Sequence, residues 1–246
     1  MESQRQWALP RSHELRDVVL LGVGMSDIGI GDQIDDYSRR FYERTLSRRF
    51  YHSVRDEMTR RRLESIGITN VLNTACPTMW TLIPEVQRRI PARKAREVLT
   101  SITDYCFDPA LDRAMLDVLG AQYEKVIIWV QGSHDIDWCL SNIVDLGSYE
   151  LIGPSLGDLD RVLQTRDVDY VGTRLHAGIR CLNNGVRTLV VAVDNRARQI
   201  GADTGLPVIE RQEIASGLLE GWINNPAPSC IQVPFEQIER WKRQFC

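Results

Sequence analysis

The sequence has little of what would place a protein in a membrane or outside the cell. No apolar run approaches 18 residues, so no segment is predicted to span a bilayer. The first residues are polar and contain no apolar core of a secretion signal. The six cysteines form no C-x-x-C pair, and we interpret them as reduced thiols of a cytosolic protein. We therefore expect neither a zinc site nor another metal cluster.

Lysine is also scarce, because only three of the 30 cationic side chains are lysines. Arginine suits bidentate recognition of phosphate or carboxylate. Residues 1–96 hold 17 Lys and Arg against 12 Asp and Glu, and residues 97–246 hold 13 against 21. A nucleic-acid binder usually shows a stronger basic patch, so we expect a small anionic substrate and no nucleic-acid partner.

The remaining composition, 43% hydrophobic and 26% charged over 246 residues, is typical of one large globular domain or two small ones. In the second part, strands alternate with helices of about ten residues, which predicts a parallel sheet of about six strands. The expected strands are 98–103, 125–130, 149–152, 168–172, 189–193 and 206–209, and the expected helices are 108–119, 135–142, 156–164, 175–184, 194–201, 214–222 and 235–245.

The first part is predicted to form a separate sheet of about three strands, at 18–21, 50–54 and 70–72, with helices at 37–46 and 57–66. Asp56 is placed to cap the second of these helices. An arginine-rich connector at 86–96 separates the two parts. We therefore predict a tail at 1–16, a first lobe at 17–88 and a second lobe at 89–246.

The stretch from Asp169 to Arg198 contains most of the candidate ligand-binding and catalytic residues. His176 is predicted in the first turn of a helix, directly after the carboxyl end of a buried strand. An open α/β sheet binds its ligands at that edge, and the free amides of a helix start favour an anion. Arg174 and Arg196, at or near two such strand ends, would add positive charge there. Taken singly, such a histidine is more often structural and such an arginine more often a solvated charge.

Four segments together resemble the polysaccharide pyruvyl transferase family over roughly residues 17–211. They are SVRD at 53–56, NVLNTACPTMW at 70–80, VGTRLHAGIR at 171–180 and AVDNRARQIGADTGLPVIER at 192–211. The resemblance implies a GT-B-like α/β fold, with two Rossmann-like parallel-sheet lobes. It also implies transfer of a ketal-linked pyruvate (carboxyethylidene) group from phosphoenolpyruvate to two hydroxyls of a sugar. The family's functional residues match Arg55, His176 and Arg196.

The family's usual opening strand and N-x-G-D turn have no counterpart at the expected spacing. The segment IGIGD at 28–32 is superficially similar, but Gly31 precedes Ser53 by only 22 positions. We therefore expect a truncated first lobe, with the Gly-rich turn after 18–21 equivalent to a later strand. The last helix carries an apolar stripe and is expected to return to the first lobe. This helix, the tail around Trp7 or a second copy of the chain would cover the exposed sheet.

The resemblance and the helix start together assign the site. His176 and Arg55 are the expected catalytic residues, since ketal formation needs an acid or base with a pKa near neutrality. The three other histidines, His13, His52 and His134, fit this role less well. The expected phosphoenolpyruvate ligands are Arg55, Arg174, Leu175, His176, Asn195 and Arg196, and the expected acceptor side is Gln131, Gly132, Ser133 and His134. No cofactor is expected besides phosphoenolpyruvate as donor.

Two other functions fit the residues. One is a GT-B-like glycosyltransferase that uses a nucleotide sugar, with Asp194 or Glu210 placed for the ribose hydroxyls. The other is a non-catalytic anion-binding remnant. If the family resemblance holds, the acceptor substrate is a sugar of a cell-surface or exopolysaccharide precursor, or a saccharide of such a precursor that is linked to a lipid or to a nucleotide. Peripheral membrane association and a homo-oligomer are compatible with this reading.

Overall fold

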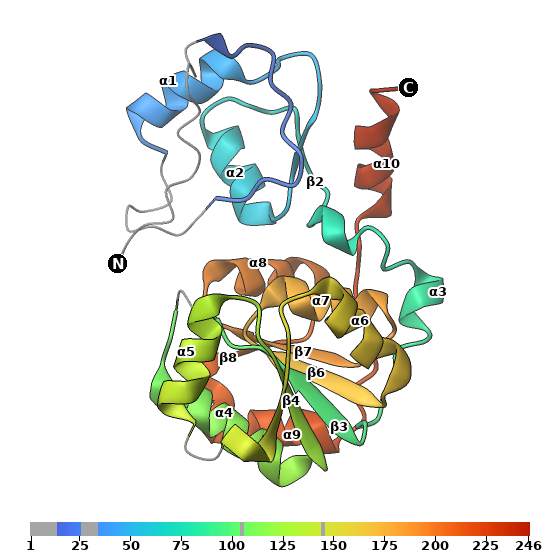
Figure 1. Ribbon diagram of the computed structural model, residues 1–246. Coiled ribbons are helices and arrows are strands. Elements are labelled where there is room, and N and C mark those ends of the chain that lie inside the picture. Colours follow the sequence, from blue (N-terminus) through green and yellow to red (C-terminus); the bar gives the residue numbers. More distant parts are fainter. Residues whose placement is uncertain (1–13, 26–33, 104–105, 144–145) are drawn as a thin grey trace. The chain divides into compact units, whose positions relative to one another are not determined.

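The computed structural model describes residues 14–25, 34–103, 106–143 and 146–246 of the chain. The chain divides into two compact units (Figure 1). One comprises residues 1–77 together with Pro234–Cys246, and the other comprises Thr78–Val233. The predicted boundary lay at residues 88 and 89. Most of the predicted tail, with Trp7 and His13, and the IGIGD segment lie outside the described residues.

The second unit is built on a six-stranded parallel sheet, as predicted. Its strands are β3 (Glu97–Thr100), β4 (Lys125–Trp129), β5 (Tyr149–Ile152), β6 (Val168–Gly172), β7 (Thr188–Ala192) and β8 (Val208–Glu210). Their order is β5-β4-β3-β6-β7-β8, and every neighbouring pair is parallel. The chain order reverses between β3 and β6, so this sheet has the topological switch point of a dinucleotide-binding fold there.

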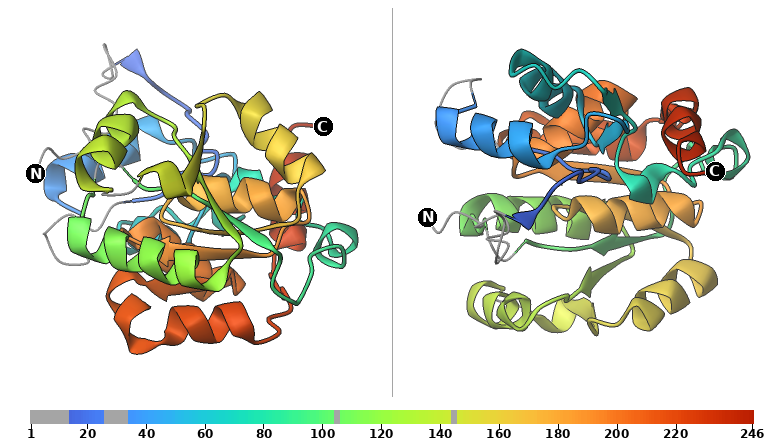
Figure 2. Two further views of the ribbon diagram at one scale, coloured as in Figure 1. Left: turned by 60° about the horizontal axis from the view of Figure 1, so that its bottom comes forward. Right: turned by 90° about the horizontal axis from the view of Figure 1, so that it is seen from above.

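Helices enclose this sheet on both faces (Figure 2). The faces follow from the alternation of side chains along each strand: Val98 packs with one helical layer and Leu99 with the other. The first layer contains α4 (Pro109–Gln122), α5 (Ser133–Asn142) and α9 (Leu218–Asn224). The second contains α6 (Leu156–Thr165), α7 (Leu175–Asn183) and α8 (Asn195–Thr204). A short helix, α3 (Pro84–Gln87), lies against α7.

A buried ionic cluster fixes one end of this unit. Arg187 on the approach to β7 donates from Nη1 to Asp169 Oδ2 at 2.8 Å, and both side chains are 1% exposed. Tyr123 donates its hydroxyl to the same carboxylate oxygen at 2.7 Å. The Arg187 guanidinium also lies 3.7 Å from the ring centroid of Trp222 and donates to the Asn225 carbonyl at 3.1 Å. The cluster therefore joins β6 and β7 to the end of α9.

The first unit contains α1 (Asp36–Thr45), β1 (His52–Val54), α2 (Glu57–Ser65), β2 (Val71–Asn73) and α10 (Phe235–Arg243). The two strands are parallel and share a small apolar core with α2. Asp56 caps α2, as predicted, because its carboxylate accepts from the Thr59 amide at 2.7 Å. The last helix, α10, contacts β2 and belongs to this unit.

The predicted third strand of this unit is wrong in the described part of the chain. Residues 18–24 run beside β1 but make only isolated parallel bridges, from Val18 to Leu46 and from Val23 to Val54. Gly22 lies between the two bridges with φ +61°, a left-handed conformation, and belongs to the Gly-rich turn predicted after residues 18–21. Its amide donates to the Ser53 side chain instead of a backbone carbonyl.

Two further boundaries differ from the prediction for local reasons. The predicted helix at 214–222 is divided into a 3-10 helix, Arg211–Ser216, and α9. Gly217 separates them with φ +84°. The last strand begins at Val208, two residues later than expected, after the Gly205 turn that ends α8. These shifts leave the carboxyl edge of the sheet as predicted.

Candidate functional site

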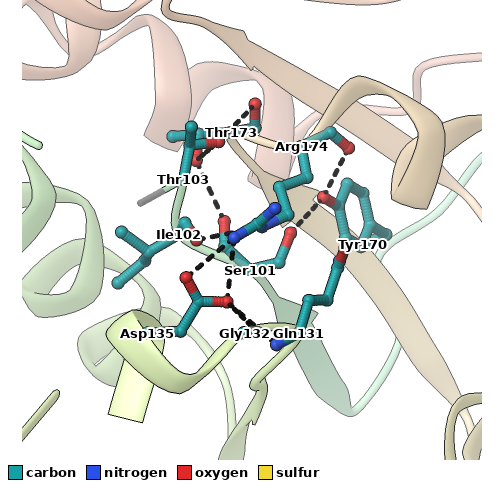
Figure 3. Close-up of polar contacts among 9 residues, drawn as sticks. All are labelled: Ser101, Ile102, Thr103, Gln131, Gly132, Asp135, Tyr170, Thr173 and Arg174. Atoms are coloured by element: carbon teal, nitrogen blue, oxygen red, sulfur yellow. Dashed lines mark hydrogen bonds and ion pairs between the residues drawn. The ribbon is translucent and has the colours of Figure 1, made fainter. Parts of the chain in front are cut away.

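The ends of β3 and β6 are joined by hydrogen bonds at the switch point of the second unit (Figure 3). Thr173 donates its amide to the Ser101 carbonyl at 2.9 Å, and its hydroxyl bonds with that of Thr103 at 3.0 Å. Tyr170 bonds with the Ser101 hydroxyl at 2.6 Å and donates to the Arg174 carbonyl at 3.0 Å. Burial raises the pKa of the Tyr170 phenol, so it remains a neutral donor. These four side chains are therefore buried and hydrogen-bonded to one another, and they form the floor of the site.

Glycine is required where these two strands meet. A Cβ on Gly172 would lie 2.7 Å from the Tyr170 hydroxyl oxygen and 2.8 Å from the Ser101 amide nitrogen. Both distances are shorter than real Cβ contacts, and the backbone atom cannot move away cheaply. Gly172 thus permits β6 to approach the end of β3 immediately before the functional turn.

Arg174 crosses this floor and is held by the protein itself. Its Nε donates to the Ile102 carbonyl at 3.1 Å. Its Nη2 lies 2.7 and 2.9 Å from the two carboxylate oxygens of Asp135 (Figure 3). The Arg174 side chain is 18% exposed and that of Asp135 is 4% exposed. Much of the hydrogen-bonding capacity of this predicted phosphoenolpyruvate ligand therefore serves to fix its own position.

Asp135 also holds the turn that the sequence assigned to the acceptor. Its Oδ2 accepts from the amides of Gln131 at 2.9 Å and Gly132 at 3.1 Å. One buried carboxylate thus connects the turn after β4 with the residue after β6. Ser133 and His134 begin α5, and His134 is exposed.

The start of α7 presents His176 to solvent. Leu175 and Ala177, on either side of it, are buried, whereas His176 is exposed. The N-cap residue Arg174 makes no side-chain capping hydrogen bond. The helix start therefore offers backbone amides and a positive dipole end beside an exposed imidazole. Leu175 can contribute its amide to a ligand there, but not its buried side chain.

The next strand, β7, leads to Asn195 and Arg196 in the first turn of α8. Asp194 caps this helix by accepting from the Arg196 amide at 2.9 Å. The same carboxylate accepts from Arg196 Nε at 2.8 Å, and both side chains are 26% exposed. Asn195 is buried. Since β6 and β7 are adjacent, the first turns of α7 and α8 follow neighbouring strands at one sheet edge.

Arg55 follows β1 at the carboxyl edge of the first unit. Its Nε lies 3.4 Å from Asp56 Oδ2, and its side chain is 18% exposed. A Cβ on Gly24 would lie 2.0 Å from the Arg55 Nε. The absence of a side chain at Gly24 therefore makes the space that the Arg55 guanidinium occupies. Glycine is therefore needed at position 24 of this turn because the Arg55 side chain approaches its backbone closely.

The other histidine and acidic candidates are occupied elsewhere. His52 is fully buried, with Nδ1 accepting from the Leu20 amide at 3.2 Å and Nε2 lying 3.0 Å from the Ser47 carbonyl. Burial lowers the pKa of His52, so it is a neutral structural residue. Asp194 binds Arg196 as above, and Glu210 pairs with Arg198 at 2.8 Å. Both carboxylates are thus paired with an arginine, and Arg196 shares its pair with Asp194.

Sequence reasoning did not single out Ser101, Tyr170 and Asp135. Asp135 did leave a signal, because it is the third residue after Gly132, where a side chain reaches back to the amides of a helix start. The long-range partners of Ser101 and Tyr170 have no such local signal.

Two absences apply to the described residues only. Within ranges 14–25, 34–103, 106–143 and 146–246, no three His, Cys, Asp or Glu side chains are grouped so as to hold a metal ion. Over the same ranges, no helix has both the length and the apolar character that crossing a membrane requires.

Comparison with known proteins adds two findings. The family model described as polysaccharide pyruvyl transferase matches residues 14–195. Among solved structures, the crystal structure of the Methanocaldococcus jannaschii UDP-GlcNAc 2-epimerase in complex with UDP-GlcNAc and UDP is similar, with a TM-score of 0.52 and 11% identity. The match covers 79% of this chain and 60% of that chain. No curated protein matches the sequence. At this identity the epimerase shows the fold alone, and it confirms the predicted GT-B-like α/β class.

Proposed function

Because the chain belongs to the polysaccharide pyruvyl transferase family, we propose that it transfers a ketal-linked pyruvate from phosphoenolpyruvate to a sugar. The acceptor we propose is a saccharide of a cell-surface or exopolysaccharide precursor, either lipid-linked or nucleotide-linked. The observation that carries the proposal is His176, an exposed imidazole on the first turn of α7 directly after a fully buried strand.

Phosphoenolpyruvate carries a phosphate and a carboxylate, and the edge around His176 offers matching groups. The amides of Leu175 and His176 and the dipole of α7 favour a phosphate. Arg196 and Asn195 begin the neighbouring helix, and Arg174 lies fixed at the same edge, with its charge balanced by Asp135. Charge-assisted contacts from arginine are short and strong, which suits a small ligand with two anionic groups.

We assign Arg55 to phosphoenolpyruvate on its place in the SVRD motif. The Gly24 turn holds its guanidinium at the end of β1, and Asp56 orients it from one side. Lysine at this position would be a point charge without the planar fork.

The reaction needs two hydroxyls and one acid–base group. The oxygen of the first sugar hydroxyl attacks the carbon next to the methylene group of phosphoenolpyruvate. The methylene carbon takes up one proton in exchange for the proton that this hydroxyl loses, and it becomes a methyl group. The second hydroxyl then displaces phosphate, and its proton leaves with the phosphate. His176 is the group proposed to move protons at the methylene carbon, because an imidazole can both accept and donate a proton.

The acceptor is proposed to lie against the turn Gln131–His134. Asp135 binds the amides of Gln131 and Gly132, so the acceptor is met by the side chains of Gln131 and His134 rather than by those amides. The Gln131 Nε2 is buried and has no hydrogen-bond partner among the described residues. A sugar hydroxyl would satisfy it.

The test measures phosphate release from phosphoenolpyruvate with a panel of sugar acceptors that carry adjacent hydroxyl pairs. Acceptor-dependent release, together with a ketal product, is the expected result. A parallel panel of nucleotide sugars distinguishes the glycosyltransferase alternative, which would consume these and leave phosphoenolpyruvate unchanged. Binding of phosphoenolpyruvate without turnover of any acceptor would indicate the anion-binding alternative.

A further inference from the structure

The first unit carries a cluster of aromatic rings at the end of α10. Phe50 stacks on Phe245 with ring centroids 6.0 Å apart and an interplanar angle of 17°. Trp241 meets the edge of Phe245 at 4.9 Å. Although it belongs to this cluster, the Phe245 side chain is 55% exposed. A single exposed ring is common on protein surfaces, so what distinguishes this one is the set of cations around it.

The geometry of this cluster is fixed by hydrogen bonds between two distant segments. The Gln244 amide group accepts from the Tyr51 amide at 2.6 Å and donates to the Tyr51 carbonyl at 3.0 Å. Arg240 lies over the Tyr51 ring at 4.4 Å and donates to its hydroxyl. The loop before β1 and the end of α10 are therefore one surface and not two independent segments.

Four cations lie beside these rings in space or in the sequence. Arg49 lies 5.0 Å from the ring centroid of Phe50, and Arg240 lies on Tyr51 as described. All four are exposed: Arg49, Arg240, Lys242 and Arg243. On α10 and after it, the acidic residues are Glu236 and Glu239, of which Glu239 pairs with Lys242 at 3.1 Å. Together with Phe50, Tyr51, Trp241 and Phe245, these cations form what we call the aromatic–basic surface.

We propose that the aromatic–basic surface docks the protein onto an anionic lipid bilayer. Clusters of four to eight Lys and Arg favour acidic headgroups, and here three cations lie on α10 and one, Arg49, lies in the loop before β1. Aromatic rings favour the boundary between headgroups and acyl chains, and the stems of the cations extend along apolar surface while their charges reach the headgroups. The protein would then lie on the bilayer, attached at the end of α10, without crossing it.

A bilayer fits this surface better than a nucleic acid does. The rings of Phe50, Trp241 and Phe245 already pack on one another, so only a rim of apolar surface projects. A single-stranded nucleic acid would need separate open ring faces on which successive bases stack. The inference rests on these contacts alone and does not depend on the proposed pyruvyl transfer.

The test is co-sedimentation of the full chain with vesicles of phosphatidylcholine alone or of phosphatidylcholine with phosphatidylglycerol. We expect binding only to the anionic vesicles, and weaker binding as salt is added. The double variant Lys242→Glu and Arg243→Glu should lower the partition coefficient at least about tenfold, since four units of charge are lost. Phe245→Ser keeps every charge and should lower it by about three- to tenfold through lost apolar burial.

The matched control is Arg88→Glu with Arg161→Glu, which makes the same change of charge on exposed residues of the second unit. This control should bind as the unchanged protein does, and circular dichroism checks that each variant is folded. If the control lost as much binding to anionic vesicles as the variant at Lys242 and Arg243, the proposal would be overturned, because the net charge of the protein and not this surface would then determine binding. Absence of binding to anionic vesicles, or displacement from them by a short RNA, would overturn it as well.

Discussion

Exchange of Asp135 for alanine removes the carboxylate that connects the two halves of the sheet edge. It leaves three donors without their acceptor: the amides of Gln131 and Gly132 and the Nη2 of Arg174. The free energy of unfolding should fall because a buried group that loses its partner retains its desolvation cost.

The magnitude follows from burial. Each amide is only half-buried, so water replaces part of the lost bond, and we assign about 1 kcal/mol to each. A fully buried ion pair that loses one partner costs about 3–5 kcal/mol. Arg174 is 18% exposed and keeps its bond to Ile102, which reduces this to about 1–3 kcal/mol. The total is about 3–5 kcal/mol, and Asp135→Asn, which keeps one acceptor oxygen, should cost about 1–3 kcal/mol.

Urea unfolding measures the loss, and amide hydrogen exchange at Gln131 and Gly132 locates it. Both amides should exchange faster in Asp135→Ala. A double-mutant cycle with Arg174→Gln should give a coupling free energy of about 1.5–3 kcal/mol, as for a hydrogen bond to a charged group. A loss below about 0.5 kcal/mol, or additivity of the two exchanges, would refute the connection described here.

Three further predictions concern stability and the donor site. Asp169→Ala should lower the free energy of unfolding by about 3–5 kcal/mol, because it leaves the buried Arg187 without its counter-ion; loss below about 1 kcal/mol in urea unfolding would contradict this. Burial lowers the pKa of His52 in the folded protein. Above pH about 6.5, the imidazole is neutral in both the folded and the unfolded chain, whereas below this pH it gains a proton only in the unfolded chain. Stability should therefore fall from pH about 6.5 to 5, and this slope should flatten in His52→Gln. Gly24→Ala, which displaces the Arg55 guanidinium, and Arg55→Lys should both raise KM for phosphoenolpyruvate; unchanged values would remove Arg55 from the site.

The parallel sheet and the placement of its carboxyl edge were accessible from the sequence. The run Leu189–Val193 is apolar because the strand is buried on both faces, and Gly185 ends the preceding helix with φ +77°. Such signals are local, so one sequence carries them. His176 could be placed on a helix start for the same reason.

The hydrogen-bond and ion-pair partners of the charged side chains could not be predicted from local sequence signals. Arg174 and Asp135 are 39 positions apart, and an arginine after a strand looks the same whether it faces a ligand or a carboxylate. Backbone conformation set a second limit. Gly217 interrupts a predicted helix with positive φ, and glycine also occurs where no such conformation is needed, as in α7 at Gly178.

The central claim is that His176 moves protons during transfer of pyruvate from phosphoenolpyruvate. The most direct measurement compares the unchanged protein with His176→Ala, counting phosphate released and ketal formed with one accepted sugar. We predict one phosphate per ketal for the unchanged protein and a rate about 10²–10⁴-fold lower for a folded His176→Ala. A folded His176→Ala with an unchanged rate, or phosphate release without ketal, would contradict the account.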